Sequence, residues 1–534
     1  MQGTCKTPFA LSPPVLPSAP IRPVLLLYAA LVVTSLVAGV ASSGVQGNPD
    51  KDVLSISAPF EFTSHDPAKD GYIYSRMQVA ETLTQANTQG EVQPLLATEW
   101  HVDNGHKTWT LTLRDGVTFH DGSPMDAVAV ANSLNIAFAK PGPLQKAPIV
   151  GISAEGGKVV IKLEKPYSPL LATLAHYSTV ILAPTAYDEA QQAIAIQATG
   201  PYQVEEFAPP HKLRVRQFAG YWGGRPGIVA AEYLTGHRAE SRALQAKSGQ
   251  ADIVYTLDPA SLNLLEREST VTVHSDHIPR TILVKVNSGH PFLKDVKARQ
   301  ALSLAIDRTG ISNSIIRVPG SEANQLVPSA LADWHVKALP PASQNREKAK
   351  QLLMELGWQD SESGTLVRDS QPFELTLITY ADRPELTVVA TALQAQWQEL
   401  GVKVNVSVGN SSDIPRMHQD GSLELALIAR NFGLIPDPLA VIQADFADAK
   451  GGDWGGMNWD NAEVRELLTR LPEETDPAAY RQASQRVAGI LAESLPLIPV
   501  TFYTQQTAVN QRVKNFRFDP FERSYFISEM ELAQ

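Results

Sequence analysis

Residues 375–408 alternate between two strand-like runs and one helix-like run, and this pattern constrains the fold more than any other feature. Leu375–Thr379 and Val402–Val408 are short, apolar and rich in β-branched residues, as buried strands are. Glu385–Leu400 between them carries apolar residues at helical spacing, and Gly401 follows it as a C-cap glycine would. The sequence therefore predicts a βαβ unit with two parallel strands.

Mixed α/β structure is expected along most of the chain. Thr108–Leu113 and Lys158–Leu163 alternate apolar and polar residues, which predicts two half-buried strands, and Asp126–Phe138 has helical spacing. Val318–Ser343, rich in Pro, Ala and polar residues, is predicted to be a long ordered loop. A chain of 534 residues exceeds the size of one hydrophobic core, so two or three lobes are expected.

The N-terminal segment differs from the rest. It has basic residues, Lys6 and Arg22, before an apolar run, Val24–Val40, and small residues end the run at Gly39-Val40-Ala41. These features predict an export signal over residues 1–41 and a mature chain beginning near Ser42; an uncleaved membrane anchor is the alternative. The one cysteine, Cys5, precedes the apolar run, so it does not fit a lipoprotein signal, and the mature chain would contain no cysteine.

Charge and absent motifs narrow the function. The formal net charge is -11, which argues against nucleic acid and anionic lipid as partners. The nucleophile elbow, the phosphate loop, the HExxH zinc helix and the dinucleotide fingerprint do not occur. His274-Ser275-Asp276-His277 is predicted to be a solvated turn rather than a metal site, and His120-Asp121 is explained by turn chemistry. No cofactor is expected.

Seven segments, in order, resemble family 5 of the extracellular solute-binding proteins, which includes dipeptide-, oligopeptide- and nickel-binding receptors. The most specific resembles the family signature: a strand, an Arg-Asp-Gly turn, a Val-x-Phe-His-Asp-Gly-x-Pro stretch and a helix. The segments are Trp109–Leu134, Thr199–Tyr202, Tyr221–Pro226, Gly249–Ile253, Val296–Arg308, Lys348–Trp358 and Pro496–Pro499.

This resemblance implies a two-lobed, type II periplasmic-binding-protein fold with an extra subdomain on the first lobe. Lobe I is expected over residues 48–93, 196–279 and 498–534, its subdomain over 94–195, and lobe II over 280–497. The implied function is that of a substrate-binding protein of an ABC importer. Such a protein is a periplasmic monomer that catalyses nothing, holds a small solute between its closed lobes and delivers it to a membrane permease.

The stretch Leu425–Pro438 carries most of the information about the ligand. Peptide-binding members usually have an Asp three residues before the Asp-Pro pair, where this chain has Leu434. Arg430-Asn431-Phe432-Gly433 is similar to the Arg-Thr-Trp-Gly stretch of nickel-type members. An Arg at a strand exit suits bidentate binding of carboxylates, so a metal–amino-acid or metal–opine chelate is favoured. A peptide held by another anchor is the alternative, and an enzyme using the same cleft is a third hypothesis.

Further ligand contacts are expected on both lobes. Tyr177 stands where nickel-type members have another Arg, which puts nickel itself in doubt. Arg76 could compensate; it is expected near a helix N-terminus, where a cation is disfavoured and needs a reason. Tyr72 and Tyr74, close to Arg76, could stack on a ligand or pack in the core. In lobe II, Asn458 and Trp459 are expected in a loop that returns to the cleft, with a simple turn as the alternative.

Overall fold

The computed structural model describes residues 52–381 and 383–533. The expected export signal at residues 1–41, with Cys5 inside it, lies outside the described residues. Within the described residues, no helix combines the length and the apolar character needed to cross a membrane.

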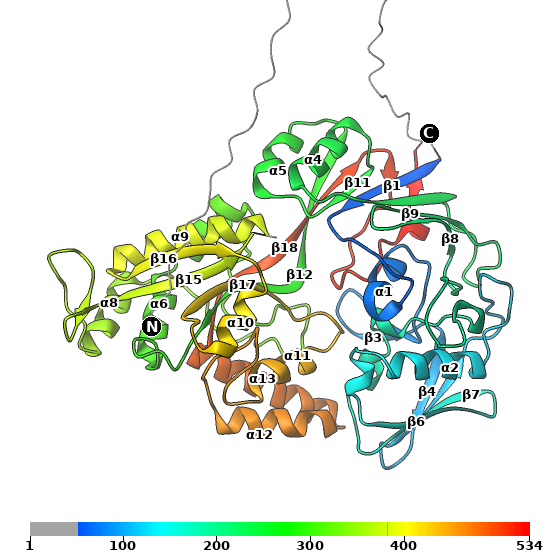
Figure 1. Ribbon diagram of the computed structural model, residues 1–534, viewed down its shortest axis with the longest axis horizontal. Coiled ribbons are helices and arrows are strands. Elements are labelled where there is room, and N and C mark those ends of the chain that lie inside the picture. The colour runs from blue at the N-terminus through cyan, green and yellow to red at the C-terminus, as the bar shows by residue number, and fades with distance from the viewer. Residues whose placement is uncertain (1–51, 382, 534) are drawn as a thin grey trace, which may run out of the picture. The chain divides into compact units, whose positions relative to one another are not determined.

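One large mixed sheet runs through the protein (Figure 1). Parallel and antiparallel neighbours both occur in it. Its ten strands, in spatial order, are β16 (Lys403–Gly409), β15 (Glu374–Tyr380), β17 (Leu425–Asn431), β12 (Val271–Val286), β18 (Leu497–Asn510), β11 (Ile253–Tyr255), β1 (Val53–Ala58), β10 (Ala230–Thr235), β9 (Lys212–Gln217) and β8 (Tyr202–Ala208).

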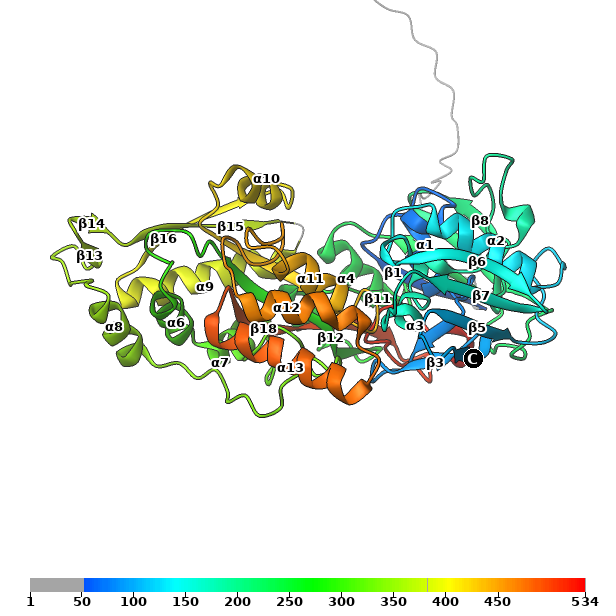
Figure 2. The ribbon, with the colours of Figure 1, turned by 90° about the horizontal axis from the view of Figure 1, so that it is seen from below.

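The predicted βαβ unit is confirmed. Strands β15 and β16 pair in parallel, and helix α9 (Pro384–Leu400) connects them. Gly401 ends the helix with a φ of 89°, in the left-handed region that favours glycine. Helices α6 (Val296–Ala305), α8 (Arg346–Glu355) and α9 lie together around this end of the sheet (Figure 2).

Strands β12 and β18 form the longest antiparallel pair and cross the centre of the sheet. Their register shifts between His277 and Thr281, so that Tyr503 on β18 has no partner in the ladder. The expected turn at His274–His277 was wrong, because these residues belong to β12 and pair with β18. The segment has polar side chains and no alternation of apolar and polar residues, so the sequence did not indicate a strand. Its pairing with β18 defines the strand instead.

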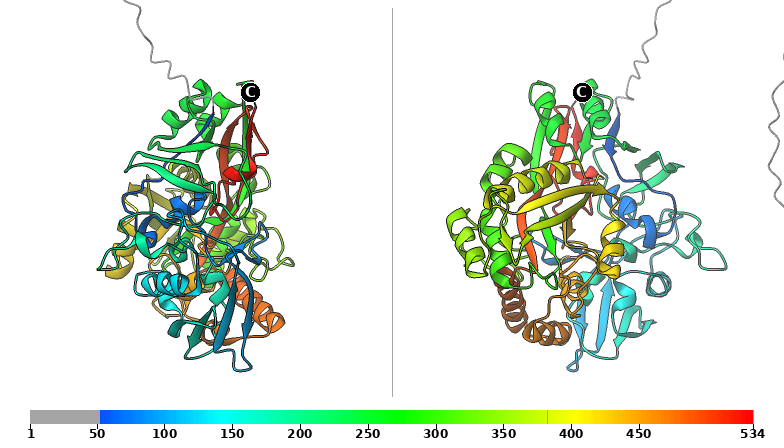
Figure 3. Two further views of the ribbon diagram at one scale, coloured as in Figure 1. Left: turned by 90° about the vertical axis from the view of Figure 1, so that its right-hand side faces the viewer. Right: turned by 60° about the vertical axis from the view of Figure 1, so that its left-hand side comes forward.

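A separate four-stranded sheet has the order β4 (Ala97–Val102), β5 (Thr108–Leu113), β7 (Lys158–Leu163) and β6 (Ile149–Glu155), and lies at the bottom of both views in Figure 3. Helix α2 (Ala127–Phe138) contacts β6 and β7. The carboxylate of Asp126 caps the helix by accepting the N–H of Ala129 at 2.8 Å. The two strands and the helix predicted here are confirmed.

The predicted loop Val318–Ser343 contains no named helix or strand, as expected. The remaining elements are further helices, helical turns and two-stranded pairs. They are α1 (Pro67–Arg76), α3 (Leu170–Thr173), α4 (Ala239–Ser248), α5 (Pro259–Leu265), α7 (Arg308–Gly310), α10 (Asp413–Asp420), α11 (Leu439–Phe446), α12 (Ala462–Arg470), α13 (Pro477–Ser494), β2 (Thr84–Ala86), β3 (Val92–Pro94), β13 (Val367–Arg368), β14 (Gln371–Pro372), β19 (Val513–Lys514), β20 (Glu531–Leu532), the π-helical turn Ile311–Ile316, and 3₁₀ turns at Leu144–Lys146, Tyr177–Thr179, Pro184–Ala186, Leu471–Glu473 and Ile527–Glu529.

Buried apolar side chains form separate cores. The largest extends from Ile278 to Phe521, a second joins Leu54 to Met530, and a third falls between Leu83 and Ala183. We call their surroundings lobe II, lobe I and the subdomain. The expected lobe boundaries stay a prediction, because all described residues belong to one unit.

Candidate functional site

Arg76 is the last residue of helix α1, and its guanidinium contacts the C-terminal segment that carries Glu522. The expectation that it stands near a helix N-terminus was wrong: Asp66 caps the start of α1, and Arg76 is in its last turn. A cation is favoured at that end by the helix dipole. The Arg76 side chain is 10% exposed, so it is not a surface arginine.

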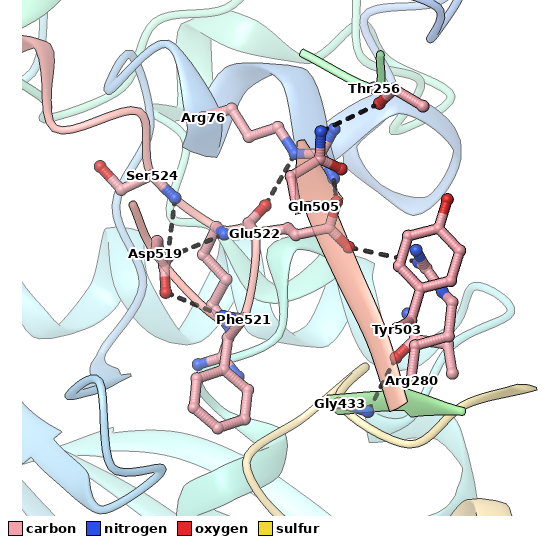
Figure 4. Close-up of polar contacts among 12 residues, drawn as sticks. Arg76, Thr256, Arg280, Gly433, Tyr503, Gln505, Asp519, Phe521, Glu522 and Ser524 are labelled. Atoms are coloured by element: carbon pink, nitrogen blue, oxygen red, sulfur yellow. Dashed lines mark hydrogen bonds and ion pairs between the residues drawn. The ribbon is translucent and has the colours of Figure 1, made fainter. Parts of the chain in front are cut away.

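Glu522 is the partner of Arg76 and also of Arg280. Arg76 Nε donates to the backbone carbonyl of Glu522 at 2.7 Å, and Arg76 Nη2 lies 3.6 Å from Glu522 Oε1. Arg280 Nη2 lies 3.2 Å from the other carboxylate oxygen, Oε2 (Figure 4). One carboxylate thus bridges a lobe I helix and the central strand β12.

The turn that carries Glu522 is fixed by Asp519. The Asp519 carboxylate accepts the backbone N–H groups of Phe521, Arg523 and Ser524 at 2.9–3.0 Å. Figure 4 shows this carboxylate facing the turn. An Asp side chain that binds backbone two or more residues ahead defines such a turn locally.

Arg383 and Tyr503 extend the cluster towards lobe II. Arg383 Nη1 donates to the phenol oxygen of Tyr503 at 3.0 Å. The guanidinium carbons of Arg280 and Arg383 lie 5.0 and 5.3 Å from the centre of the Tyr503 ring. Two cations therefore share one aromatic ring, an arrangement in which each cation–ring attraction offsets part of the repulsion between the cations.

Arg523 is buried without an acceptor. Its Nη1 and Nη2 atoms are inaccessible to solvent, and no described residue accepts a hydrogen bond from either. Burial lowers the pKa of Arg523 to about 10, and Asp519 opposes that shift. Burial, and secondly the charge of Arg523, lower the pKa of the neighbouring His176 to about 3. We call Arg76, Arg280 and Arg383, whose charges all act on Glu522, the arginine cluster. Arg523 does not belong to it, because its charge acts on Asp519 and His176 instead.

Positive charge exceeds negative charge in this region. Burial raises the pKa of Glu522, but Arg280, Arg76 and Arg383 lower it by more, so its carboxylate is ionised at neutral pH. Glu385 is the other carboxylate whose charge acts on the arginine cluster. Three cations thus face two anions, and the surplus favours an incoming anion.

Aromatic rings surround the Arg76 side of the cluster. The Arg76 guanidinium carbon lies 4.5 Å from the centre of the Phe60 ring and 5.5 Å from that of Tyr72. Tyr72 and Tyr177 meet edge to face, with ring centres 6.0 Å apart. Tyr74 is fully buried in the lobe I core and its hydroxyl donates to the carbonyl of Ser64, so it packs rather than faces this group.

Arg430 is already paired within the protein. Its Nε and Nη2 atoms donate to the two oxygens of Asp445 at 2.8 and 2.7 Å, a bidentate arrangement. The Asp445 side chain is 2% exposed and that of Arg430 is 17% exposed. Asp445 therefore occupies the fork that was expected to hold a ligand carboxylate, and ligand contact by Arg430 stays a prediction.

The other lobe II residues predicted to contact the ligand lie at separate places rather than together at the arginine cluster. Asn431 pairs with Arg280 in the ladder between β17 and β12, and its Oδ1 accepts the Gly433 N–H at 2.8 Å. Phe432 is fully buried in the lobe II core, which also contains Trp459. The Asn458 amide donates to Asn287 at 2.9 Å. Asn431 is thus the one nearest to the cluster.

Sequence reasoning missed Arg280, Arg383, Tyr503, Glu522 and Arg523. A usable signal exists in the stretch 516–526, FRFDPFERSYF, where charged residues alternate with aromatic ones. Such a mixture is unusual for a solvated tail and indicates charges held against apolar surface. No comparable signal marks Arg280 or Tyr503, which lie inside strands.

Metal ligation is a separate matter. Among residues 52–381 and 383–533, no group of three or more His, Cys, Asp or Glu side chains is placed to hold a metal ion.

Known proteins resemble this chain over most of its length. It is 26% identical over 500 residues to the nickel-binding protein NikA of Staphylococcus aureus, covering 92% of this chain and 96% of that protein. It is 25% identical over 464 residues to the probable D,D-dipeptide-binding periplasmic protein DdpA of Escherichia coli, covering 84% and 87%. The crystal structure of NikA from Brucella suis in complex with Fe(III)-EDTA matches with a TM-score of 0.80 at 22% identity, covering 90% and 99%.

The structural match confirms the predicted two-lobed fold. The family model described as bacterial extracellular solute-binding proteins, family 5 middle, matches residues 91–453. Its members bind solutes for ABC importers and are not enzymes. The chain therefore belongs to family 5 of the bacterial extracellular solute-binding proteins.

Proposed function

We propose that the protein captures a small carboxylate-bearing solute between its lobes, such as a chelate of nickel or another metal, and delivers it to a permease in the cytoplasmic membrane. The observation that carries this proposal is the arginine cluster, together with the buried guanidinium of Arg523, the next residue after Glu522, which lacks an acceptor among the described residues.

A buried charge without a partner is costly. Leaving a buried donor unsatisfied costs about 1–3 kcal/mol, and more for a charged group. A ligand carboxylate would supply acceptors in the planar geometry that a guanidinium matches. Its charge would also offset the positive surplus of the cluster. An anionic solute therefore gains more here than a neutral one of the same size.

Among the residues predicted from the sequence, we propose Arg76, Tyr72 and Tyr177 as ligand contacts. The Tyr72 ring lies against the Arg76 guanidinium, and the Tyr177 ring lies against Tyr72. Asn431 is a further proposal, because the ladder places it beside Arg280.

A peptide is the alternative solute. Glu522 supports this alternative, because its carboxylate could bind the α-ammonium of a peptide. Peptide-binding members bind that ammonium with an Asp at the position where this chain has Leu434. The similarity to a probable D,D-dipeptide-binding protein supports the same alternative.

Native mass spectrometry of the protein as purified tests the proposal first, because a retained solute shows its mass directly. Calorimetry with Ni(II) alone, Fe(III)–EDTA and D-alanyl-D-alanine then compares the solute classes. We expect a carboxylate chelate to bind and Arg523→Gln to weaken it by roughly 30- to 5,000-fold, the effect of truncating one side of a buried charge pair.

Arg517→Gln is the matched control, since Arg517 lies in the same stretch but is 45% exposed and paired with Glu529. The proposal is wrong if both variants bind the chelate as the wild type does, or if only the dipeptide binds.

Export is part of the same proposal. We expect the protein recovered from the periplasm to begin near Ser42. N-terminal sequencing that finds Met1 intact on the exported protein would contradict cleavage and support a retained anchor.

A further inference from the structure

A polar contact joins the subdomain to lobe II. On the subdomain side it is made by the loop between β7 and α3, and on the lobe II side by the 3₁₀ turn Leu471–Glu473 between α12 and α13. The Ser168 N–H donates to the carbonyl of Pro472 at 2.8 Å. The Ser168 hydroxyl lies within hydrogen-bonding distance of the carbonyls of Pro472, at 3.2 Å, and of Glu474. Because these partners are 304 and 306 residues apart in the chain, the contact depends on how the two parts of the protein meet.

An exposed ion pair extends this contact. Lys165 Nζ lies 2.8 Å from Glu473 Oε1, and the two side chains are 53% and 44% exposed. No apolar core continues across the contact, because the buried apolar residues of the subdomain and those of lobe II form separate clusters within the described residues. Contacts between parts of a chain that move relative to each other are typically polar in this way.

Each side of the contact is anchored in its own part of the protein. On the subdomain side, Leu170 is fully buried in the core, and its N–H donates to the carbonyl of Tyr167 at 3.2 Å. On the lobe II side, Leu471 is buried in the core, and its carbonyl accepts the Glu474 N–H at 3.2 Å. A cavity of about 260 Å³ lined by residues of both sides adjoins the contact. The two sides can therefore separate without unfolding either part.

We propose that this contact, which we call the latch (residues 165–168 and 472–474), holds the subdomain against lobe II in the closed protein and breaks when the solute enters or leaves. This inference rests on the lobe closure of the proposed function. The latch contains none of the proposed ligand contacts. Weakening it therefore shifts the balance between open and closed molecules, and that shift shortens the time for which the solute is retained.

Reversing one charge tests the latch through its ion pair. Lys165→Glu sets two carboxylates against each other, and the double variant Lys165→Glu with Glu473→Lys restores an opposite-charge pair. Small-angle scattering of the solute-free protein at low ionic strength measures the radius of gyration. We expect a larger radius for the single variant and the wild-type radius for the double variant. Lys162→Glu is the matched control, because its pair with Glu155 is similarly exposed, 52% for each side chain, but lies within the subdomain.

Release of a solute supplies the second readout. Fe(III)–EDTA is the probe, and stopped-flow fluorescence measures its dissociation rate. We expect Lys165→Glu and Ser168→Ala to release the probe roughly 3- to 10-fold faster than the wild type, since each loses one polar contact of the closed state. The effect of Lys165→Glu should fade at high salt, whereas that of Ser168→Ala, which removes no charge, should persist.

Ser168→Ala is the milder change and should also enlarge the radius of the solute-free protein. Wild-type radii for both Lys165→Glu and Ser168→Ala overturn the inference, and so does an increase that the double variant does not reverse. Release of the probe at the wild-type rate by both single variants overturns it as well. If no protein binds Fe(III)–EDTA, the proposed binding of a carboxylate chelate fails, and the scattering still decides whether the latch exists.

Discussion

Arg430 and Arg523 are both largely withdrawn from water, but they differ in what surrounds them. Arg430 meets a matched carboxylate, Asp445, through two short hydrogen bonds. Arg523 meets the ring of Phe521 at 5.1 Å and no acceptor among the described residues. The first guanidinium is satisfied within the protein, and the second has no acceptor among the described residues. Position at a strand exit is therefore weaker evidence for ligand binding than an unmet hydrogen-bonding need.

The largest expected effect comes from breaking the satisfied pair. Arg430→Ala leaves Asp445 buried without its partner, and the free energy of unfolding should fall by about 3–5 kcal/mol. Urea denaturation measures this, with Arg465→Ala, from the exposed pair with Asp460, as the control. A small stability change together with a 30-fold or larger loss of chelate affinity would instead restore Arg430 as the ligand clamp.

Lys285 lies close to Arg430 and Asp445, and its titration should make the free energy of unfolding depend on pH. Its Nζ donates to the carbonyls of Gly452 and Gly455, and burial, opposed by Asp445, lowers the pKa of Lys285 to about 7. The folded state then binds fewer protons than the unfolded state between pH 7 and 10.5, so stability rises with pH there.

We expect a slope of up to about 1.4 kcal/mol per pH unit between pH 7 and 9, measured by urea denaturation at several pH values. Lys285→Met should remove this slope, and Lys297→Met, at an exposed ion pair, should not. Identical slopes in all three proteins would show that Lys285 keeps its ordinary pKa.

Arg523→Met and Arg430→Met should change the free energy of unfolding in opposite directions. Removing an unsatisfied buried guanidinium should raise the free energy of unfolding of the solute-free protein by about 1 kcal/mol. Removing the satisfied one should lower it. If both substitutions destabilise the protein equally, Arg523 has a partner and the contrast between the two sites disappears.

The smallest effect is expected at an exposed ion pair, which gives a baseline for the buried ones. Arg517 and Glu529 form an ion pair with side chains 45% and 47% exposed. Such pairs contribute less than about 1 kcal/mol and are screened by salt. Glu529→Gln should therefore change the melting temperature only slightly, and the change should vanish at high salt. A large fall in melting temperature that does not depend on salt would mean that the exposed fraction of a charged side chain does not predict its contribution to stability.

Local patterns predicted local structure well. The βαβ unit at 374–409, helix α2 and the strands β5 and β7 could be predicted because periodicity and capping residues act within one element. The segment His274–His277 could not, since its strand is held by partners on β18 more than 220 residues away.

The candidate site was harder for the same reason. Arg76 contacts a residue 446 positions later in the chain, and Arg280 contacts one 242 positions later. Asp445 is only 15 residues from Arg430, but its side chain reaches the guanidinium because α11 folds back on β17, which no pattern in the sequence specifies. The strand exit and the family resemblance predicted a carboxylate-binding arginine at Arg430, and tertiary packing pairs that arginine with Asp445 instead.

The interrupted ladder between β12 and β18 has a mechanical consequence. Arg280 and Tyr503 lie at the interruption, where the two strands are not paired with each other. Movement about a pivot grows in proportion to distance from it, so a slight adjustment around these two side chains becomes a wide swing at the far ends of the lobes. If the solute binds beside these two side chains, as we propose, a small local displacement on binding would change the relative orientation of the lobes far more at their ends than at the site itself.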